Sequence, residues 1–262
     1  MERIALIHKY LNDFEIFRKT EEFLFYIFLK ENRTHYSILR TNFYELLKAF
    51  DHHNDPSYDN IIWQSKPNIR WKLQREIIRL LSNYLSSIYW MVNFSRKKQS
   101  QYLSANPNSL NQFELDKITN FKNNATHQFV QDLRNFVNHE AFLKITSIKS
   151  SSIEKPEIER NIYISREQLL NSSFNWKSQV KDFIKAQEEK IYIIDILQNH
   201  FHKFSMFQNK VYKKIICADI QLTQNLILQL EDFIDRAMTL QLSHILPFNQ
   251  ANIRYLKYIS KL

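Results

Sequence analysis

The chain has no glycine in 262 residues, whereas an average protein contains about 7% glycine. Tight hairpin turns in β-sheets generally need backbone positions with positive φ, which glycine supplies most readily. Helices need no such positions along their length, and Asn, which is abundant here, can serve at their C-terminal ends. The absence of glycine therefore predicts a helical protein. It also excludes glycine-rich phosphate-binding loops of the Walker or dinucleotide-binding type.

The chain is long and hydrophobic enough to bury a substantial core, because 44% of its residues are hydrophobic. We expect a single helical domain over residues 1–262. The longest apolar run, Phe23 to Leu29, is far shorter than the roughly 20 residues that a membrane helix needs, and the N-terminus has no signal-peptide pattern. Cys217 is the single cysteine, which excludes an internal disulfide and a multi-cysteine zinc site. These features predict a cytoplasmic protein with no membrane association.

The net charge is +9 and the calculated pI is near 9.4. Such a charge favours an anionic partner, such as nucleic acid or a membrane surface. An excess of solvated lysines explains it equally well, so charge alone does not identify the partner.

Hydrophobic residues recur at helical spacing through most of the chain. This periodicity predicts six helices, over residues 11–31, 38–51, 68–98, 113–142, 176–212 and 218–242. The fifth is predicted to break near Ser205, and the polar segment 99–112 is predicted to be a loop. Residues 143–148 and 161–165 alternate apolar and polar side chains, which predicts two short antiparallel strands. The predicted fold is an all-α helical bundle with a small two-stranded β-hairpin insertion after the fourth helix.

The fourth predicted helix has two different sides. An α-helix turns about 100° per residue, and one side forms an apolar stripe of Val130, Leu133 and Val137. The roughly opposite side presents Asp132, Asn135 and His139. Asn135 and His139 are four residues apart, where side chains on a helix meet. The amide of Asn135 is therefore expected to hold the imidazole of His139 in one orientation.

The pattern Arg134-Asn135-x-x-x-His139 resembles the signature of the HEPN superfamily, helical-bundle proteins of which many are metal-independent endoribonucleases. A long amphipathic helix, a loop and then a helix that carries this motif is the order that HEPN proteins show. The resemblance implies a HEPN-like core over about residues 32–210. The N-terminal helix 11–31 and the C-terminal extension 211–262 have no assigned role.

Cleaving RNA without a metal requires a base for the ribose 2′-OH proton, an acid for the leaving 5′-oxygen, and positive charge for the phosphate. Histidine suits the first two tasks because its ordinary pKa, about 6.5, lies near working pH. Arginine suits the third because it is always charged and binds two phosphate oxygens at once. The predicted catalytic residues are Arg134, Asn135 and His139, with His139 as acid and base and Arg134 stabilising the phosphate. We expect no metal and no cofactor.

Two basic segments are candidates for contact with RNA. Arg96, Lys97 and Lys98 end the third predicted helix and are the predicted substrate-binding residues; the alternative is a solvated end whose cations suit the helix dipole. The tail 254–258 is basic and aromatic, a composition that can stack on single-stranded bases. We favour a packed terminal turn for this tail.

Three other histidines are not expected to form a site. His127 lies about three turns before His139 on the same predicted helix, roughly 18 Å away along the axis. His200 and His202 are two residues apart on a helix and face different ways, which does not suit a metal pair.

One motif supplies only one histidine. The resemblance implies a twofold homodimer that brings two copies each of His139 and Arg134 into a composite active site, as isologous packing would generate. Family members often act as toxins or abortive-infection effectors restrained by a partner. The resemblance therefore implies RNA as substrate, a role in toxin–antitoxin or antiviral defence, and an antitoxin or other regulatory partner.

Two alternatives remain open. The first is a non-catalytic HEPN-like helical module that binds RNA or a protein without performing chemistry. The second is a helical adaptor with no nucleic-acid role, for which the aromatic first helix would be the interface. RNA binding through phosphates weakens steeply as salt rises, whereas apolar association does not, so salt dependence separates these readings.

Overall fold

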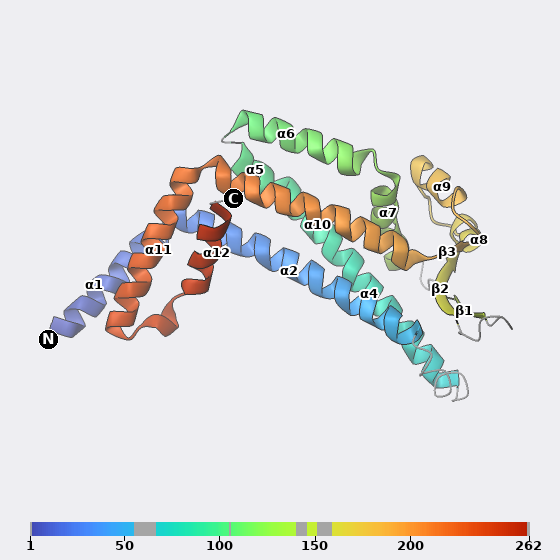
Figure 1. Ribbon diagram of the computed structural model, residues 1–262, viewed down its shortest axis with the longest axis horizontal. Coiled ribbons are helices and arrows are strands. Elements are labelled where there is room, and N and C mark those ends of the chain that lie inside the picture. Colours follow the sequence, from blue (N-terminus) through green and yellow to red (C-terminus); the bar gives the residue numbers. More distant parts are fainter. Residues whose placement is uncertain (1, 55–66, 105, 140–145, 151–158, 261–262) are drawn as a thin grey trace. The chain divides into compact units, whose positions relative to one another are not determined.

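The structure is a computed structural model that describes residues 2–54, 67–104, 106–139, 146–150 and 159–260 (Figure 1). Most of these residues are helical, and the few strands form a small antiparallel sheet. The chain divides into two compact units: unit 1 is Met1–Thr34, Phe94–Phe113 and Phe207–Leu262, and unit 2 is His35–Asn93 and Glu114–Met206. Two compact units can still fold as one cooperative domain, so the single domain and its core boundaries stay predictions.

Unit 1 contains the helices from both ends of the chain. Helix α11 (Ile220–Leu240) packs against both α1 (Glu2–Phe17) and α12 (Gln250–Ser260) (Figure 1). The other elements with residues in this unit are α2 (Glu21–Asn54), the π-helical turn η2 (Ser95–Gln99), α5 (Ser100–Leu103), α6 (Pro107–Lys117), α10 (Ile193–Ala218) and the 3-10 turn η4 (Ser243–Ile245).

An aromatic cluster joins the helices of unit 1. The ring of Phe17 in α1 stacks on Phe233 in α11 with 4.9 Å between centroids, and it meets Phe23 of α2 at 5.2 Å. Tyr10 packs edge-on against Phe233 at 5.8 Å, and its buried hydroxyl donates to the Phe233 carbonyl at 3.4 Å. The N-terminal helix and the C-terminal region, which had no assigned role, therefore share one core.

Unit 2 contains the motif helix and the sheet. Its further elements are α4 (Pro67–Phe94), the π-helical turn η3 (Ile118–Lys122), α7 (Ala125–His139), β1 (Thr146–Ser150), β2 (Glu159–Ser165), α8 (Arg166–Leu170), α9 (Ser178–Lys185) and β3 (Lys190–Ile191). The strand order is β1-β2-β3, and both pairings are antiparallel, with Ile148 opposite Asn161 and Ile164 opposite Ile191. The predicted β-hairpin is confirmed, with β3 as an addition; residues 143–145 of its first predicted strand lie outside the described residues.

The first two predicted helices have the wrong boundaries. The chain breaks at 18–20, where Thr20 Oγ1 accepts from the Phe23 amide at 3.3 Å and two acidic residues follow in the first turn of α2. These are signals of a helix start, and the apolar pattern across 11–31 obscured them. Helix α2 then continues without interruption to Asn54, and within it the buried Asn32 accepts from the side chain of Gln99 at 2.8 Å.

The loop predicted over 99–112 is wrong, and so is the predicted start of the motif helix. Helices α5 and α6 occupy most of that segment, and α6 begins with Pro107 after Asn106, whose side chain accepts from the Ser109 amide at 3.1 Å. The motif helix begins at Ala125, not at 113, because Asn124 caps it by accepting from the His127 amide at 3.0 Å. The expected order of long helix, loop and motif helix is therefore not observed.

The helix predicted over 176–212 is also wrong. Helix α9 ends at Lys185, β3 follows, and α10 begins at Ile193 and runs through Ser205 without a break. The last predicted helix is confirmed as α11. It ends at Gln241, whose φ of 60° is the one positive φ among the described residues. The glycine-free chain thus uses left-handed backbone once in the part described.

The cap at Asn124 is testable. Replacing Asn124 with Ala removes the acceptor for the His127 amide and should lower the free energy of unfolding by about 1 kcal/mol. Asn124→Ser keeps an acceptor oxygen and should stay within a few tenths of a kcal/mol of the wild type. Urea unfolding followed by circular dichroism measures both, and equal losses in the two variants would contradict the cap.

Candidate functional site on helix α7

Helix α7 is buried along two neighbouring stripes. Val130 and Leu133 of the predicted apolar stripe are buried, and Val137 is half-buried. A second stripe faces the segment around α9: the ring centroid of Phe129 lies 5.3 Å from Phe183, and that of Phe136 lies 5.2 Å from Trp176. The second stripe was not anticipated. It restricts the accessible part of this helix to the side that carries Arg134, Asn135 and Asn138.

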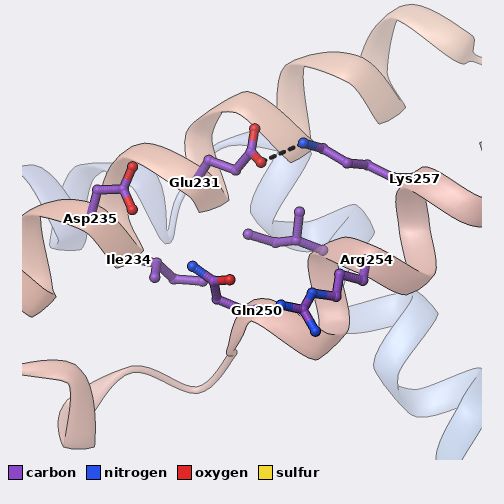
Figure 2. Close-up of a pocket in the computed structure, with 7 residues that line it drawn as sticks. Glu231, Ile234, Asp235, Gln250, Arg254 and Lys257 are labelled. Carbon is purple, nitrogen blue, oxygen red and sulfur yellow. Dashed lines mark hydrogen bonds and ion pairs between the residues drawn. The ribbon is translucent and has the colours of Figure 1, made fainter.

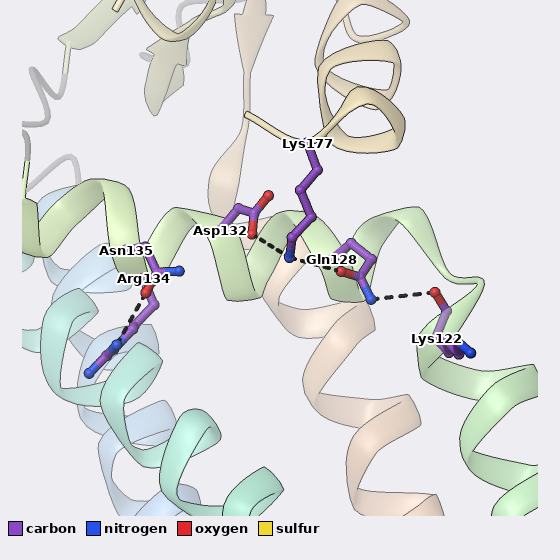
Figure 3. A network of polar contacts seen from close by, with 6 residues as sticks. All are labelled: Lys122, Gln128, Asp132, Arg134, Asn135 and Lys177. Atoms are coloured by element: carbon purple, nitrogen blue, oxygen red, sulfur yellow. Dashed lines mark hydrogen bonds and ion pairs between the residues drawn. The ribbon is translucent and has the colours of Figure 1, made fainter. Parts of the chain in front are cut away.

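Asp132 lies within the second stripe and is buried, contrary to the prediction that it shares a polar face with Asn135. Its side chain is 5% exposed, and its Oδ1 accepts from Lys177 Nζ at 2.9 Å. Lys177 Nζ also lies 3.3 Å from Gln128 Oε1, while Gln128 Nε2 donates to the Lys122 carbonyl at 3.4 Å (Figure 3). This network fastens the first half of α7 to the residue that precedes α9. It also neutralises the acid beside the motif.

Arg134 is held by an aromatic ring and an amide. Its guanidinium carbon lies 4.2 Å from the ring centroid of Tyr89, on α4. Its Nη1 donates to Asn135 Oδ1 at 3.1 Å (Figure 3). Its Nε is buried without a hydrogen-bond partner among the described residues. Within that part of the chain, no carboxylate forms an ion pair with Arg134. Within the described residues, the guanidinium is thus positioned by groups that carry no charge.

His139 is the last residue of α7. Its side chain lies outside the described residues, and so does the predicted contact between Asn135 and His139. Asn135 uses its oxygen to accept from Arg134. Within the described residues, this amide therefore orients the arginine.

The predicted substrate-binding residues form the outer side of the turn η2 in unit 1. Arg96, Lys97 and Lys98 are all exposed, while Ser95 and Gln99 on either side of them are buried. The Gln99 amide nitrogen donates to Asn32 Oδ1 at 2.8 Å and to Gln208 Oε1 at 2.9 Å, and Gln208 Nε2 donates to Ser95 Oγ at 3.0 Å. Anchored at both ends, the turn directs its basic triplet to solvent. The triplet and Arg134 belong to different units, so their use in one site stays a prediction.

A buried pair of histidines in unit 2 was missed in the sequence. His127 Nδ1 and His200 Nε2 are 2.9 Å apart, so one ring nitrogen donates to the other, and the rings stack with 5.1 Å between centroids. Burial holds the pKa of His200 well below its usual value, and the nearby His127 and Lys203 act in the same direction. No third His, Cys, Asp or Glu among the described residues joins them in a group that can hold a metal. The two residues are 73 positions apart, and no local pattern relates them.

The C-terminal tail is packed against the protein, as we predicted for residues 254–258. It forms α12, in which Ile253 and Leu256 are buried, and Tyr255 lies 6.1 Å from Tyr212 between ring centroids. Beside it, Glu231, Ile234, Asp235, Gln250, Arg254 and Lys257 line a small pocket between α11 and α12 (Figure 2). The ion pair of Lys257 with Glu231, at 2.5 Å, lies at the edge of this pocket. With acids and bases facing each other across it, the pocket has no dominant charge to select a ligand.

No protein-family model, curated protein or solved structure matches this chain. The HEPN assignment therefore rests on the motif and stays a prediction. Across the part of the chain that the structure describes, no helix has the length and apolar character to cross a bilayer.

The buried histidine pair predicts a pH-dependent stability. The unfolded chain protonates His200 below about pH 6.5, whereas the folded chain resists protonation there because its pKa is lowered. The free energy of unfolding should therefore fall as pH drops below 6.5, by up to about 1.4 kcal/mol per pH unit for one proton. In His200→Gln this slope should be shallower.

Urea unfolding at pH 7.5, 6.5, 5.5 and 5.0 measures the slope. His202→Gln is the matched control, because His202 is exposed on the same helix, and its slope should equal that of the wild type. An unchanged slope in His200→Gln would show that the pair does not resist protonation.

Proposed function

We propose that this chain is a metal-independent endoribonuclease that cleaves RNA through attack by the ribose 2′-OH, acting as a toxin or antiviral defence effector. The observation that carries the proposal is the state of Arg134. It lies on the motif helix, is fixed by Tyr89 and Asn135, and is not neutralised by a described carboxylate. An arginine in this state is suited to bind a phosphate, because its charge is not already compensated.

The surrounding charges support this role. Asp132 is the acid nearest in sequence to Arg134, and a free carboxylate there would oppose the approach of a phosphate. It is instead buried and paired with Lys177. Among the described residues of α7, Arg134 is therefore a charged side chain that no acid of the same helix opposes.

In the proposed reaction, one histidine takes the proton of the 2′-OH and the 2′-oxygen attacks phosphorus. The bond from phosphorus to the 5′-oxygen breaks, and a second histidine gives that oxygen a proton. The products are a 2′,3′-cyclic phosphate and a 5′-hydroxyl end. His139 follows Arg134 by five residues, about 7.5 Å along the helix axis, a span that one nucleotide linkage can bridge.

The proposed reaction uses two histidines, and each copy of the motif supplies one of them. We therefore include a homodimer with a composite site in the proposal, in which each protomer contributes His139 and Arg134. RNA is the proposed partner. An antitoxin or other regulatory protein would restrain the activity in the cell.

The first prediction of this proposal concerns His139. Wild-type protein incubated in EDTA with mixed tRNA and mRNA should release fragments with cyclic-phosphate ends, and His139→Ala should release none, because the acid and base are lost. The control is His8→Ala, which removes an exposed histidine of α1 and should cleave like the wild type. Fragments with 3′-hydroxyl and 5′-phosphate ends would rule out the mechanism. RNA that is bound but left intact by the wild type would favour the non-catalytic module.

The second concerns Arg134. Both Arg134→Ala and Arg134→Lys should lower kcat by roughly 100-fold, the usual effect of losing one donor to transition-state charge, because lysine cannot donate to two phosphate oxygens in a fixed plane. Arg75→Lys is the matched control: Arg75 lies 5.1 Å from the ring centroid of Trp71 on α4 and should keep its activity. If Arg134→Lys retained full kcat, Arg134 would have only a structural role.

A further inference from the structure

An open groove lies between α2 and α10 within unit 2. Its volume is about 380 Å³, within the size range of ligand sites in proteins. Its lining includes Arg40, Phe43 and Tyr44 on α2 and Gln198, Phe201 and His202 on α10. The lining residues recur every three or four positions on each helix, so one face of each helix forms a wall. We call this the α2–α10 groove.

The floor and one wall of the groove are aromatic. Phe43 and Phe201 stack with 4.0 Å between centroids and an angle of 12° between planes. Tyr44 meets Phe201 edge-on at 6.1 Å and remains 48% exposed. A buried pair of rings thus supports a third, accessible ring. Accessible aromatic rings of this kind stack on planar ligands, including nucleobases.

The charge in the groove is positive or neutral. The guanidinium carbon of Arg40 lies 5.5 Å from the Tyr44 ring centroid, and the exposed His202 lies on the opposite helix. None of the lining residues is acidic. Aromatic walls alone would also suit a quaternary ammonium ligand, but Arg40 repels a cation. The combination favours a ligand that joins an aromatic plane to an anionic group.

The α10 wall of the groove also carries polar side chains. Gln198 is exposed there, and its amide can both donate and accept a hydrogen bond. Ser205 lines the same wall, but its Oγ is buried and forms no hydrogen bond with any described residue, so a ligand in the groove does not reach it. The polar edge of a nucleobase is complementary to the amide of Gln198.

We infer that the α2–α10 groove binds a base of single-stranded RNA, stacked on Tyr44, with its edge toward Gln198 and the phosphate of that nucleotide near Arg40 and His202. The inference deepens the proposed function, on which it rests for RNA as the ligand. It adds a site for substrate selection that is separate in sequence from the motif on α7. Stacking of this kind tolerates every base, and the amide of Gln198 adds hydrogen bonds that depend on the base edge.

The test measures binding of fluorescent single-stranded RNA 12-mers of A or of U by anisotropy, in full-length protein with His139→Ala to prevent cleavage. Tyr44→Ala should weaken binding about tenfold or more, as expected for one lost base stack, while Tyr44→Phe should bind within twofold of the parent. Trp71→Ala is the matched control, because Trp71 is exposed and paired with Arg75 on α4, outside the groove. Its binding should be unchanged.

Gln198→Ala is a second variant, which removes an exposed side chain and leaves the aromatic residues of the groove in place. It should weaken binding of at least one of the two RNAs, because it removes the amide that faces the base edge. Equal binding by the parent, Tyr44→Ala and Gln198→Ala would overturn the inference. An equal loss in Trp71→Ala would also overturn it.

Cleavage and binding measurements together distinguish an error in the groove inference from an error in the nuclease proposal. In the first outcome, the wild type and Tyr44→Ala cleave RNA at the same rate and with the same dependence on RNA concentration. The groove inference is then wrong, and the nuclease proposal is supported. In the second outcome, RNA binding depends on Tyr44, but neither the wild type nor any variant cleaves RNA. The groove inference is then supported, and the protein is a binding module. Absence of any RNA binding overturns the groove.

Discussion

Burial of α7 along two adjacent stripes is the constraint on which the candidate site depends. Leu133 on one stripe and Phe136 on the other are both buried, so rotation of the helix about its axis would expose one set of large apolar side chains. Exposing one such side chain costs about 1.5 to 3 kcal/mol, which is more than any single polar contact on this helix supplies. Packing therefore decides which residues of α7 face solvent. Arg134 and Asn135 lie on the accessible side of the helix, next to the buried stripes.

Among the described residues of α7, the acid Asp132 has an ion-pair partner and the base Arg134 has none. Burying Asp132 without a partner would cost several kcal/mol, and Lys177 offsets that cost. Because Lys177 is itself 62% exposed, solvent screens this pair, and the network contributes orientation more than net stability. Arg134 contacts the ring of Tyr89 and the amide of Asn135, and neither group carries a charge.

Unit 2 thus offers two chemically different surfaces to the proposed substrate. The motif on α7 presents a positioned cation for a phosphate, which is the same in every nucleotide. The α2–α10 groove presents aromatic surface and the exposed amide of Gln198, which suit the base, the part of a nucleotide that differs. In nucleic-acid recognition generally, contacts to the phosphate backbone position the protein, and contacts to the bases select the sequence. The histidine pair between α7 and α10 belongs to neither surface, because both of its residues are buried, and we assign it to the stability of the unit.

The sequence by itself determined the helical class, the β-hairpin, the last long helix and the existence of an amphipathic helix around Arg134. Each of these depends on local periodicity or on the absence of glycine, which act over neighbouring residues. Several helix starts were also encoded locally, at Thr20, Asn106 and Asn124. A continuous apolar pattern concealed the starts after Thr20 and Asn124, because periodicity indicates burial and does not show a change of chain direction. The polar composition of residues 99–112 concealed the start after Asn106. Only the tertiary structure decided that Asp132 is buried against Lys177, that Arg134 lies on Tyr89, and that His127 meets His200. These contacts join residues about 45 to 73 positions apart, and they form because packing brings together side chains that no local pattern relates.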